Sequence, residues 1–131
     1  MVEDNLADAL LVREALREAG LSLDVHPAAD GELAIAFIEK AESDPTAPSP
    51  DVVILDINLP RVDGFEVLRR IRASERFRSL PVMIMTSSDS PADKNESARL
   101  ANGYFRKCPD YEEFLRIGPA VRQLLETHGL M

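Results

Sequence analysis

The chain has 131 residues, a formal net charge of −8 and one cysteine, Cys108. This size suits a single domain, and the acidic balance argues against nonspecific nucleic-acid binding, which needs lysine and arginine to neutralise phosphates. No apolar run approaches the roughly 20 residues of a membrane span, and no signal peptide is apparent. A lone cysteine cannot form an internal disulfide. We therefore expect one cytoplasmic domain over residues 1–131, without an output domain or membrane partner.

Strand-like and helical patterns alternate along the first half of the chain. Met1 and Val2 could end a first strand, and Asn5 is a candidate N-cap for a helix over residues 6–19 that Gly20 ends. Residues 23–28 resemble a short strand. A second helix is expected after Asp30-Gly31, with an apolar face formed by Leu33, Ala34, Phe37, Ile38 and Ala41.

The same alternation continues in the second half of the chain. Residues 52–55 and 82–85 are apolar runs typical of strands buried on both faces, and residues 103–105 resemble another short strand. Helices are expected at about 64–74, 92–101 and 111–127. The last should kink or restart at Gly118-Pro119, because proline cannot donate a backbone hydrogen bond.

Polar residues of complementary type follow the expected strands. They are Glu3 and Asp4 after the first strand, Asp56 after the run at 52–55, Thr86 after the run at 82–85, and Lys107 after the last strand. Ligand sites in open parallel sheets lie beyond the carboxyl ends of the strands, so these side chains are expected to converge at one edge. Taken alone, Asp56 is equally compatible with a helix-capping role.

Such a group of side chains suits phosphoryl transfer. Close carboxylates repel one another unless a cation neutralises them, and oxygen ligands suit Mg²⁺. With the cation bound, one carboxylate could attack phosphorus while Thr86 and Lys107 contact phosphoryl oxygens. Phosphoryl transfer depends mostly on positioning and charge neutralisation, which this set supplies.

The chain resembles the receiver domain of bacterial two-component response regulators. The matching segments, in the order and approximate spacing of that family, are Glu3-Asp4-Asn5, Val53 to Gly64, Pro81 to Ser88, and Tyr104 to Lys107. The resemblance implies an α/β, doubly wound, five-stranded parallel sheet of flavodoxin-like type, with strand order 2-1-3-4-5 and helices on both faces.

The resemblance also implies a role for each site residue. Asp56 would be phosphorylated by a sensor histidine kinase. Asp4, Asp56 and the main-chain carbonyl of Asn58 would ligate Mg²⁺, with Glu3 acting through a water. Thr86 and Lys107 would contact the phosphoryl group, and Tyr104 would follow Thr86 between inactive and active states. Asn58 and Ser88 match positions that tune the phosphate lifetime.

Two features depart from the family pattern. Only Met1 and Val2 precede the acidic pair, although a strand usually has five or six residues, so we expect a truncated first strand. We interpret this as a start upstream of Met1; the alternatives are a weakened core or a strand supplied by a partner. Cys108 stands where the family usually has proline. Since a cis bond to a non-proline residue costs about 3–4 kcal/mol, the Lys107–Cys108 bond is expected to be trans.

The leading hypothesis is therefore a stand-alone phosphoacceptor that is not an enzyme beyond self-phosphorylation and autodephosphorylation. The loop at residues 43–50 is long and proline-rich, as in small regulators paired with bacterial phytochrome kinases. A homodimer through the fourth helix, last strand and last helix is a further expectation. The alternatives are a degenerate receiver used as a phosphorylation-independent binding or dimerisation module, and a phosphohydrolase. The latter usually carries a second acid two residues after the nucleophile, where this chain has Asn58.

Overall fold

The computed structural model describes residues 1–131. Its elements in chain order are α1 (Leu6–Glu18), α2 (Gly31–Ser43), β1 (Val53–Asp56), α3 (Gly64–Ala73), β2 (Val82–Thr86), α4 (Pro91–Leu100), β3 (Gly103–Arg106), α5 (Tyr111–Phe114) and α6 (Ile117–Thr127). The alternation of helices and strands expected from the sequence is confirmed. No helix has both the length and the apolar character needed to cross a membrane.

The sheet is parallel and has three strands in the order β1-β2-β3. The two remaining strands of the expected five-stranded sheet are each reduced to one bridging residue. Val2 bridges Ala28 on one side and Leu55 on the other, both in parallel orientation. The expected strand at residues 23–28 is therefore wrong in extent, because one bridging residue cannot support a ladder of hydrogen bonds along it. The five-strand order stays a prediction.

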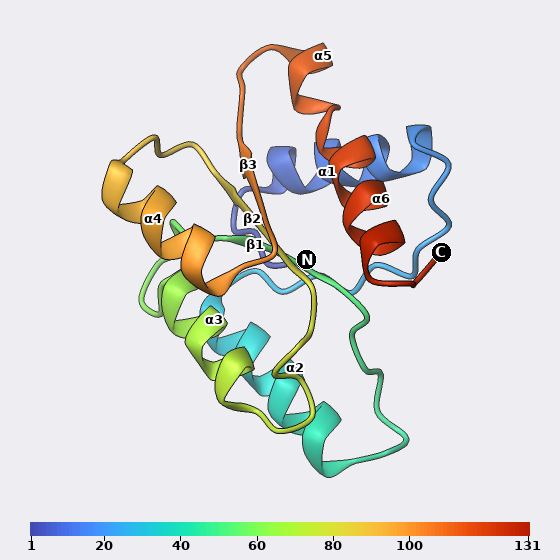
Figure 1. The fold of residues 1–131 in the computed structure, drawn as a ribbon, viewed down its shortest axis with the longest axis vertical. Coiled ribbons are helices and arrows are strands. Elements are labelled where there is room, and N and C mark those ends of the chain that lie inside the picture. The colour runs from blue at the N-terminus through green and yellow to red at the C-terminus, as the bar shows by residue number, and fades with distance from the viewer.

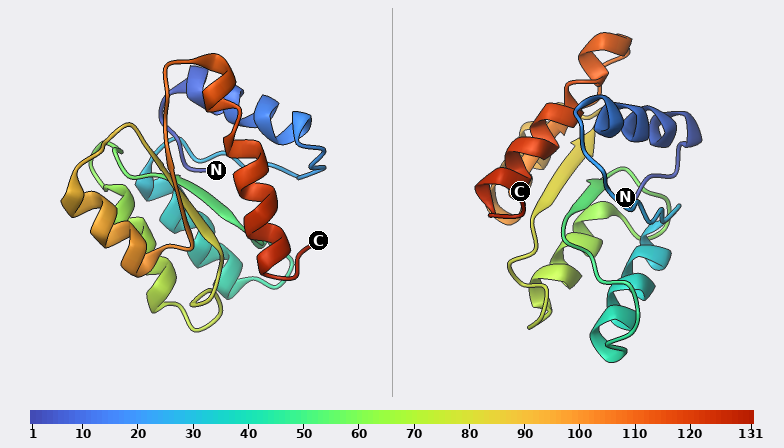
Figure 2. Two further views of the ribbon diagram at one scale, coloured as in Figure 1. Left: turned by 45° about the horizontal axis from the view of Figure 1, so that its top comes forward. Right: turned by 90° about the vertical axis from the view of Figure 1, so that its right-hand side faces the viewer.

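Helices cover both faces of the sheet, as Figures 1 and 2 show. Strand residues alternate between the faces, since successive side chains in a strand point in opposite directions. Val53, Leu55 and Ile84 pack with α2 and α3, whereas Ile54 and Met83 pack with α1 and α6. The chain thus forms a three-layer α/β structure with a separate hydrophobic core on each side of the sheet.

Five helices begin at a side chain that accepts a hydrogen bond from the first turn. These N-caps are Asn5, Asp30, Asp63, Ser90 and Asp110. The predicted cap at Asn5 is confirmed, and Gly20 follows α1 with a φ of +77°. Leu33 was expected to face inward but is 54% exposed. It lies in the first turn of α2, and the buried face of that helix is instead Gly31, Ala34, Ile38 and Ala41.

The expected interruption of the last helix is confirmed, and it divides the segment into α5 and α6. Pro119 has no N–H to donate to the carbonyl of Leu115, and the Gly118 N–H bonds to that carbonyl instead, at 3.1 Å. Gly118 also lets the two helices approach closely, since a Cβ at this position would overlap the main chain of Ala15. The glycine thus fixes α6 against α1.

A single arginine links several segments at the amino end of the sheet. Arg72, half-buried near the end of α3, donates hydrogen bonds to four oxygens. These are the carbonyls of Leu100 (2.8 Å), Arg78 (3.1 Å) and Leu80 (2.7 Å) and the Asn102 side-chain oxygen (2.8 Å). Burial lowers the pKa of Arg72. Its hydrogen bonds connect α3 to the segments entering β2 and β3.

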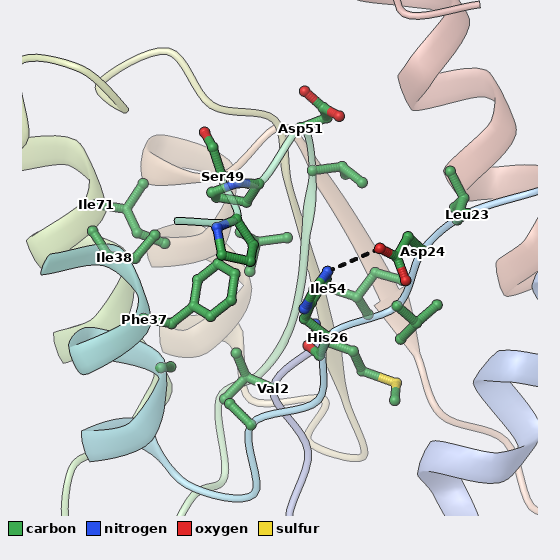
Figure 3. Close-up of a pocket in the computed structure, with 18 of the residues that line it drawn as sticks. Val2, Leu23, Asp24, His26, Phe37, Ile38, Ser49, Asp51, Ile54 and Ile71 are labelled. Carbon is green, nitrogen blue, oxygen red and sulfur yellow. Dashed lines mark hydrogen bonds and ion pairs between the residues drawn. The ribbon is translucent and has the colours of Figure 1, made fainter. Parts of the chain in front are cut away.

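The same end of the sheet contains an apolar cavity of about 360 Å³. It lies between α2, the segment 23–28 and the start of β1, and Phe37 and Ile38 face Val2 and His26 across it (Figure 3). Val2 is the residue that bridges the segment ending at Ala28 and strand β1. The Met1 ammonium donates to the His26 carbonyl at 3.1 Å, and burial lowers its pKa to about 6.

Candidate functional site

The predicted site residues meet at the opposite, carboxyl end of the sheet. Asp56 is the last residue of β1, Thr86 is the last residue of β2, and Lys107 directly follows β3. Glu3 directly follows the bridging residue Val2. The Asp56 and Thr86 residues are 3% and 0% exposed, so neither is an ordinary surface polar group. The convergence predicted from the parallel strand ends is therefore present.

Lys107 is the centre of this cluster. Its Nζ donates hydrogen bonds to Asp8 Oδ2 at 2.8 Å and to Asp56 Oδ2 at 2.9 Å. It also lies 2.7 Å from Glu3 Oε1, as an ion pair without hydrogen-bond geometry. The chain contains no cis peptide bond, so the Lys107–Cys108 bond is trans, as expected. Lys107 reaches Asp56 without a proline at position 108.

The buried charges change their proton affinities in opposite ways. Burial raises the pKa of Glu3 to about 7, although Lys107 and the Asn5 N–H work against this effect. Burial opposes the charge of Lys107, but the contacts with Asp8, Glu3 and Asp56 outweigh it and raise the pKa of the ammonium. One ammonium therefore serves three carboxylates, and the cluster carries excess negative charge when all three are ionised.

Three carboxylates converge closely enough to share a metal ion. One oxygen from each of Glu3, Asp4 and Asp56 lies within 4.8 Å of the others. Glu3 Oε2 accepts from the Asn5 N–H at 3.1 Å, whereas the buried Glu3 Oε1 lies 2.7 Å from the Lys107 ammonium. Asp4 is exposed. Three converging carboxylates, two of them buried and ion-paired with a single ammonium, fit a hard divalent cation such as Mg²⁺, which prefers oxygen ligands.

Asn58 connects Asp56 to Thr86. The Asn58 main-chain N–H donates to Asp56 Oδ1 at 2.8 Å, and its side-chain Nδ2 donates to Thr86 Oγ1 at 2.8 Å. No hydrogen bond joins the Thr86 and Asp56 side chains directly. The predicted hydroxyl is thus held next to the site, and its link to the carboxylate runs through Asn58.

Ser88 and Tyr104 continue this network away from Asp56. The Ser88 N–H donates to Thr86 Oγ1 at 3.0 Å, and the Ser88 hydroxyl donates to Asp93 Oδ2 at 2.9 Å at the start of α4. The Tyr104 hydroxyl donates to the Ser88 carbonyl at 2.8 Å. The two predicted residues, Tyr104 and Ser88, therefore lie on one hydrogen-bonded path from Thr86 to α4 and β3.

The loop after β1 is held firmly beneath this network. Asp63 caps α3 by accepting from the Glu66 N–H at 3.1 Å, and the Gly64 N–H donates to the Ile57 carbonyl at 3.1 Å. A Cβ at Gly64 would overlap the backbone of Asp56 and Ile57. Arg61 in the same loop has a φ of +64°, a conformation that is unusual for a residue with a side chain. The close packing of Gly64 fixes where the Asp56 backbone lies.

Asp8 is the residue that sequence analysis missed at this site. It lies in the first turn of α1, where an acid is common because it complements the helix dipole. Its spacing from Asn5 therefore gave no functional signal. Only the position of Lys107 in space distinguishes Asp8 from an ordinary helix-start acid.

Comparison with known proteins gives consistent results. A family model described as the response regulator receiver domain matches residues 1–117. The response regulator Rcp1 of Synechocystis sp. is 31% identical over 129 residues, covering 97% of this chain and 88% of that protein.

Two solved structures resemble the whole fold. The phosphorylated cyanobacterial phytochrome response regulator RcpA has a TM-score of 0.83 at 32% identity, covering 93% of this chain and 88% of that one. The Mn²⁺-bound form of Rcp1 has a TM-score of 0.82 at 30% identity, with the same coverage of 93% and 88%. The fold and the sequence therefore match the same group of proteins.

Proposed function

We propose that this chain, which belongs to the response regulator receiver domain family, accepts a phosphoryl group on Asp56 and acts as a phosphorylation-based switch. The observation that best supports this proposal is the hydrogen bond between Lys107 Nζ and Asp56 Oδ2, inside a buried cluster at the carboxyl end of the sheet. As the phosphorus–nitrogen bond of a kinase phosphohistidine breaks, an Asp56 oxygen forms the new bond to phosphorus. The imidazole leaves with the electron pair.

A divalent cation is part of this proposal. Glu3, Asp4 and Asp56 would hold Mg²⁺, which is supported by the convergence of their oxygens and by the burial of Glu3 and Asp56. The sequence-based assignment adds the Asn58 main-chain carbonyl as a ligand and lets Glu3 act through water. When bound, the cation supplies positive charge against the phosphoryl oxygens. The Mn²⁺-bound form of the similar protein Rcp1 supports a divalent ion in general.

The chain's own residues would stabilise and transmit the modification. Lys107 would transfer a hydrogen bond from Asp56 to a phosphoryl oxygen, and Thr86 would leave its contact with Asn58 to donate to another. Because the Ser88 N–H and the Tyr104 hydroxyl are linked to Thr86 through one path, this movement would alter the start of α4 and the surface of β3. Asn58 and Ser88 would set how long the aspartyl phosphate lasts.

The partner would be a sensor histidine kinase. Its assignment as a phytochrome kinase rests on the similarity to cyanobacterial phytochrome response regulators. We further propose that residues 1–131 act as a single cytoplasmic receiver domain. A homodimer through α4, β3 and α6 would place the switching surface at the interface.

The experiment is intact mass after incubation with acetyl phosphate and Mg²⁺. One phosphoryl adduct is expected in the wild-type protein, and none in Asp56→Ala. The matched control is Asp63→Ala, which removes a nearby helix cap instead of the acceptor. An adduct of equal yield in Asp56→Ala would refute the assignment.

The reduced first strand favours one competing function, a receiver that binds a partner without being phosphorylated. Val2 makes a single bridge on each side, so the strand pairing is short here. Such a module would fold and bind its partner equally well in wild-type and Asp56→Ala proteins. Absence of the adduct from a folded wild-type protein would support that alternative.

A further inference from the structure

Lys107 has three anionic partners, and they are not equivalent. Glu3 and Asp56 belong to the group of carboxylates whose oxygens converge within 4.8 Å. Asp8 lies outside that group, yet it forms a 2.8 Å hydrogen bond with Lys107 Nζ. Glu3 and Asp56 thus combine a contact with the ammonium with membership of the converging carboxylates, whereas Asp8 has only the former.

Asp8 is held in place by its helix. The Asp8 N–H donates to Asn5 Oδ1 at 3.1 Å at the N-cap of α1, and the side chain is 25% exposed. Lys107 comes from a different part of the fold and is anchored by its N–H, which donates to the Thr86 carbonyl at 2.7 Å. The ion pair therefore joins two backbones that are fixed independently.

A cation at Glu3 and Asp56 changes what Lys107 can contact. Those two carboxylates would share their charge with the cation, and their hold on the ammonium would weaken because like charges repel. Among the three carboxylates that contact Lys107 in the structure, only the negative charge of Asp8 would not be partly neutralised by the cation. The ammonium, 12% exposed on its side chain, would otherwise lose its nearest counter-charges.

We propose that Asp8 is a positioning residue, which holds the Lys107 ammonium beside Asp56 when a divalent cation occupies the neighbouring carboxylates. This role rests on the proposed function of the site. Asp8 touches neither the phosphoryl group nor the cation. It acts by keeping its hydrogen bond to the Lys107 ammonium. Lys107 can then release Asp56 for cation binding and still remain close enough to contact the phosphoryl group.

The first test measures cation binding without any phosphodonor. Mg²⁺ affinity is determined by calorimetric titration for the wild type, Asp8→Asn, Lys107→Met and the double variant. Without Asp8, Lys107 competes more strongly for Glu3 and Asp56, so Asp8→Asn should weaken Mg²⁺ binding about fivefold. In the Lys107→Met background the same substitution should change it less than about twofold.

The matched control is Glu18→Gln, which removes the same charge from the far end of α1. Its Mg²⁺ affinity should remain within about 1.5-fold of the wild type, since an exposed charge this distant is screened. Circular dichroism confirms that each variant is folded. Equal losses with and without Lys107, or no loss in Asp8→Asn, would overturn the role of Asp8.

Phosphoryl uptake provides the second readout. At saturating Mg²⁺, Asp8→Asn should take up phosphate from acetyl phosphate about fivefold more slowly, with no further slowing in the Lys107→Met background. A wild-type protein that shows the Mg²⁺ coupling but no uptake would refute the phosphoacceptor function while supporting the Asp8–Lys107 pair. Failure of the wild type to bind Mg²⁺ at millimolar concentration would overturn both.

Discussion

The two ends of the parallel sheet differ in how their polar groups are paired. At the carboxyl end, the single ammonium of Lys107 contacts three carboxylates, those of Glu3, Asp8 and Asp56. At the amino end, Arg72 donates hydrogen bonds to four oxygens, and the remaining space beside Val2 is an apolar cavity. One end concentrates unbalanced charge, whereas the other combines a satisfied polar link with incomplete packing.

This difference separates chemistry from stability within one small sheet. A cluster with excess negative charge costs folding free energy, but it creates affinity for a cation. A satisfied hydrogen-bonding group and a buried apolar surface both contribute to stability without reactive chemistry. Changes at the amino end should therefore alter unfolding much more than phosphoryl uptake, and the following predictions test that division.

The largest effect on stability is expected from Arg72→Met. The substitution removes four hydrogen bonds and leaves partly buried carbonyls without a donor, which should cost about 3 kcal/mol in the free energy of unfolding. Urea denaturation measures this loss. Uptake of phosphate by the folded fraction should not change. Arg99→Met is the control, because its exposed pair with Glu96 should contribute less than about 0.5 kcal/mol.

Gly64→Ala should lower both the free energy of unfolding and phosphoryl uptake. It therefore tests where stability and chemistry are not separate. The new Cβ would meet the backbone of Asp56 and Ile57, and overpacking of this kind costs about 2 kcal/mol. Because the displaced backbone includes Asp56 itself, uptake per folded molecule should also fall, as intact mass would reveal. Gly103→Ala is the control, since its Cβ would meet only the flexible end of Met83. Normal uptake in Gly64→Ala would contradict the positional role of Gly64.

Filling the amino-end cavity should stabilise the chain. An Ile-Val-Val-Ile extension joined to Met1 would continue between residues 23–26 and 50–53 and bury apolar side chains. After the entropic cost of ordering four residues, a gain of about 1 kcal/mol is expected in urea denaturation. A Gly-Ser-Gly-Ser extension of equal length should give none. Equal gains from both extensions would show that apolar filling is not the cause.

The smallest effect is expected from pH in the cation-free protein. The folded state keeps the Glu3 proton up to about pH 7, whereas an unfolded glutamate releases it near 4.5. The folded state therefore binds more protons between these values, and stability should fall as pH rises through them. Above pH 6 the Met1 ammonium opposes this trend, because its folded pKa is below that of the unfolded chain.

Unfolding in urea with a chelator, from pH 4.5 to 7, measures this dependence. The net change should be less than about 1 kcal/mol. Glu3→Gln should flatten the fall between pH 4.5 and 6, and Mg²⁺ should do the same in the wild type by stabilising the ionised carboxylate. A wild-type curve that rises over pH 4.5 to 6 would contradict the direction given for Glu3.

Sequence analysis predicted the convergence of side chains at the carboxyl end better than it predicted the extent of the sheet. Asp56, Thr86 and Lys107 follow apolar runs, and parallel strands bring such ends together, so local pattern was sufficient for these residues. The strand at residues 23–28 was predicted from local pattern too, but a strand needs a partner along its length, and Val2 provides one bridge. Asp8 could not be found, because its contact with Lys107 joins residues 99 positions apart.

The hydroxyl of Tyr104, hydrogen-bonded to the Ser88 carbonyl, has an optical consequence. The chain contains two tyrosines and no tryptophan. The other tyrosine, Tyr111, is exposed and donates to Glu14 on α1 at 2.6 Å. In a Tyr111→Phe protein, the tyrosine absorbance and emission would come from Tyr104 alone. The protein thus contains its own spectroscopic reporter, placed on the path that leaves Asp56, and needs no attached dye.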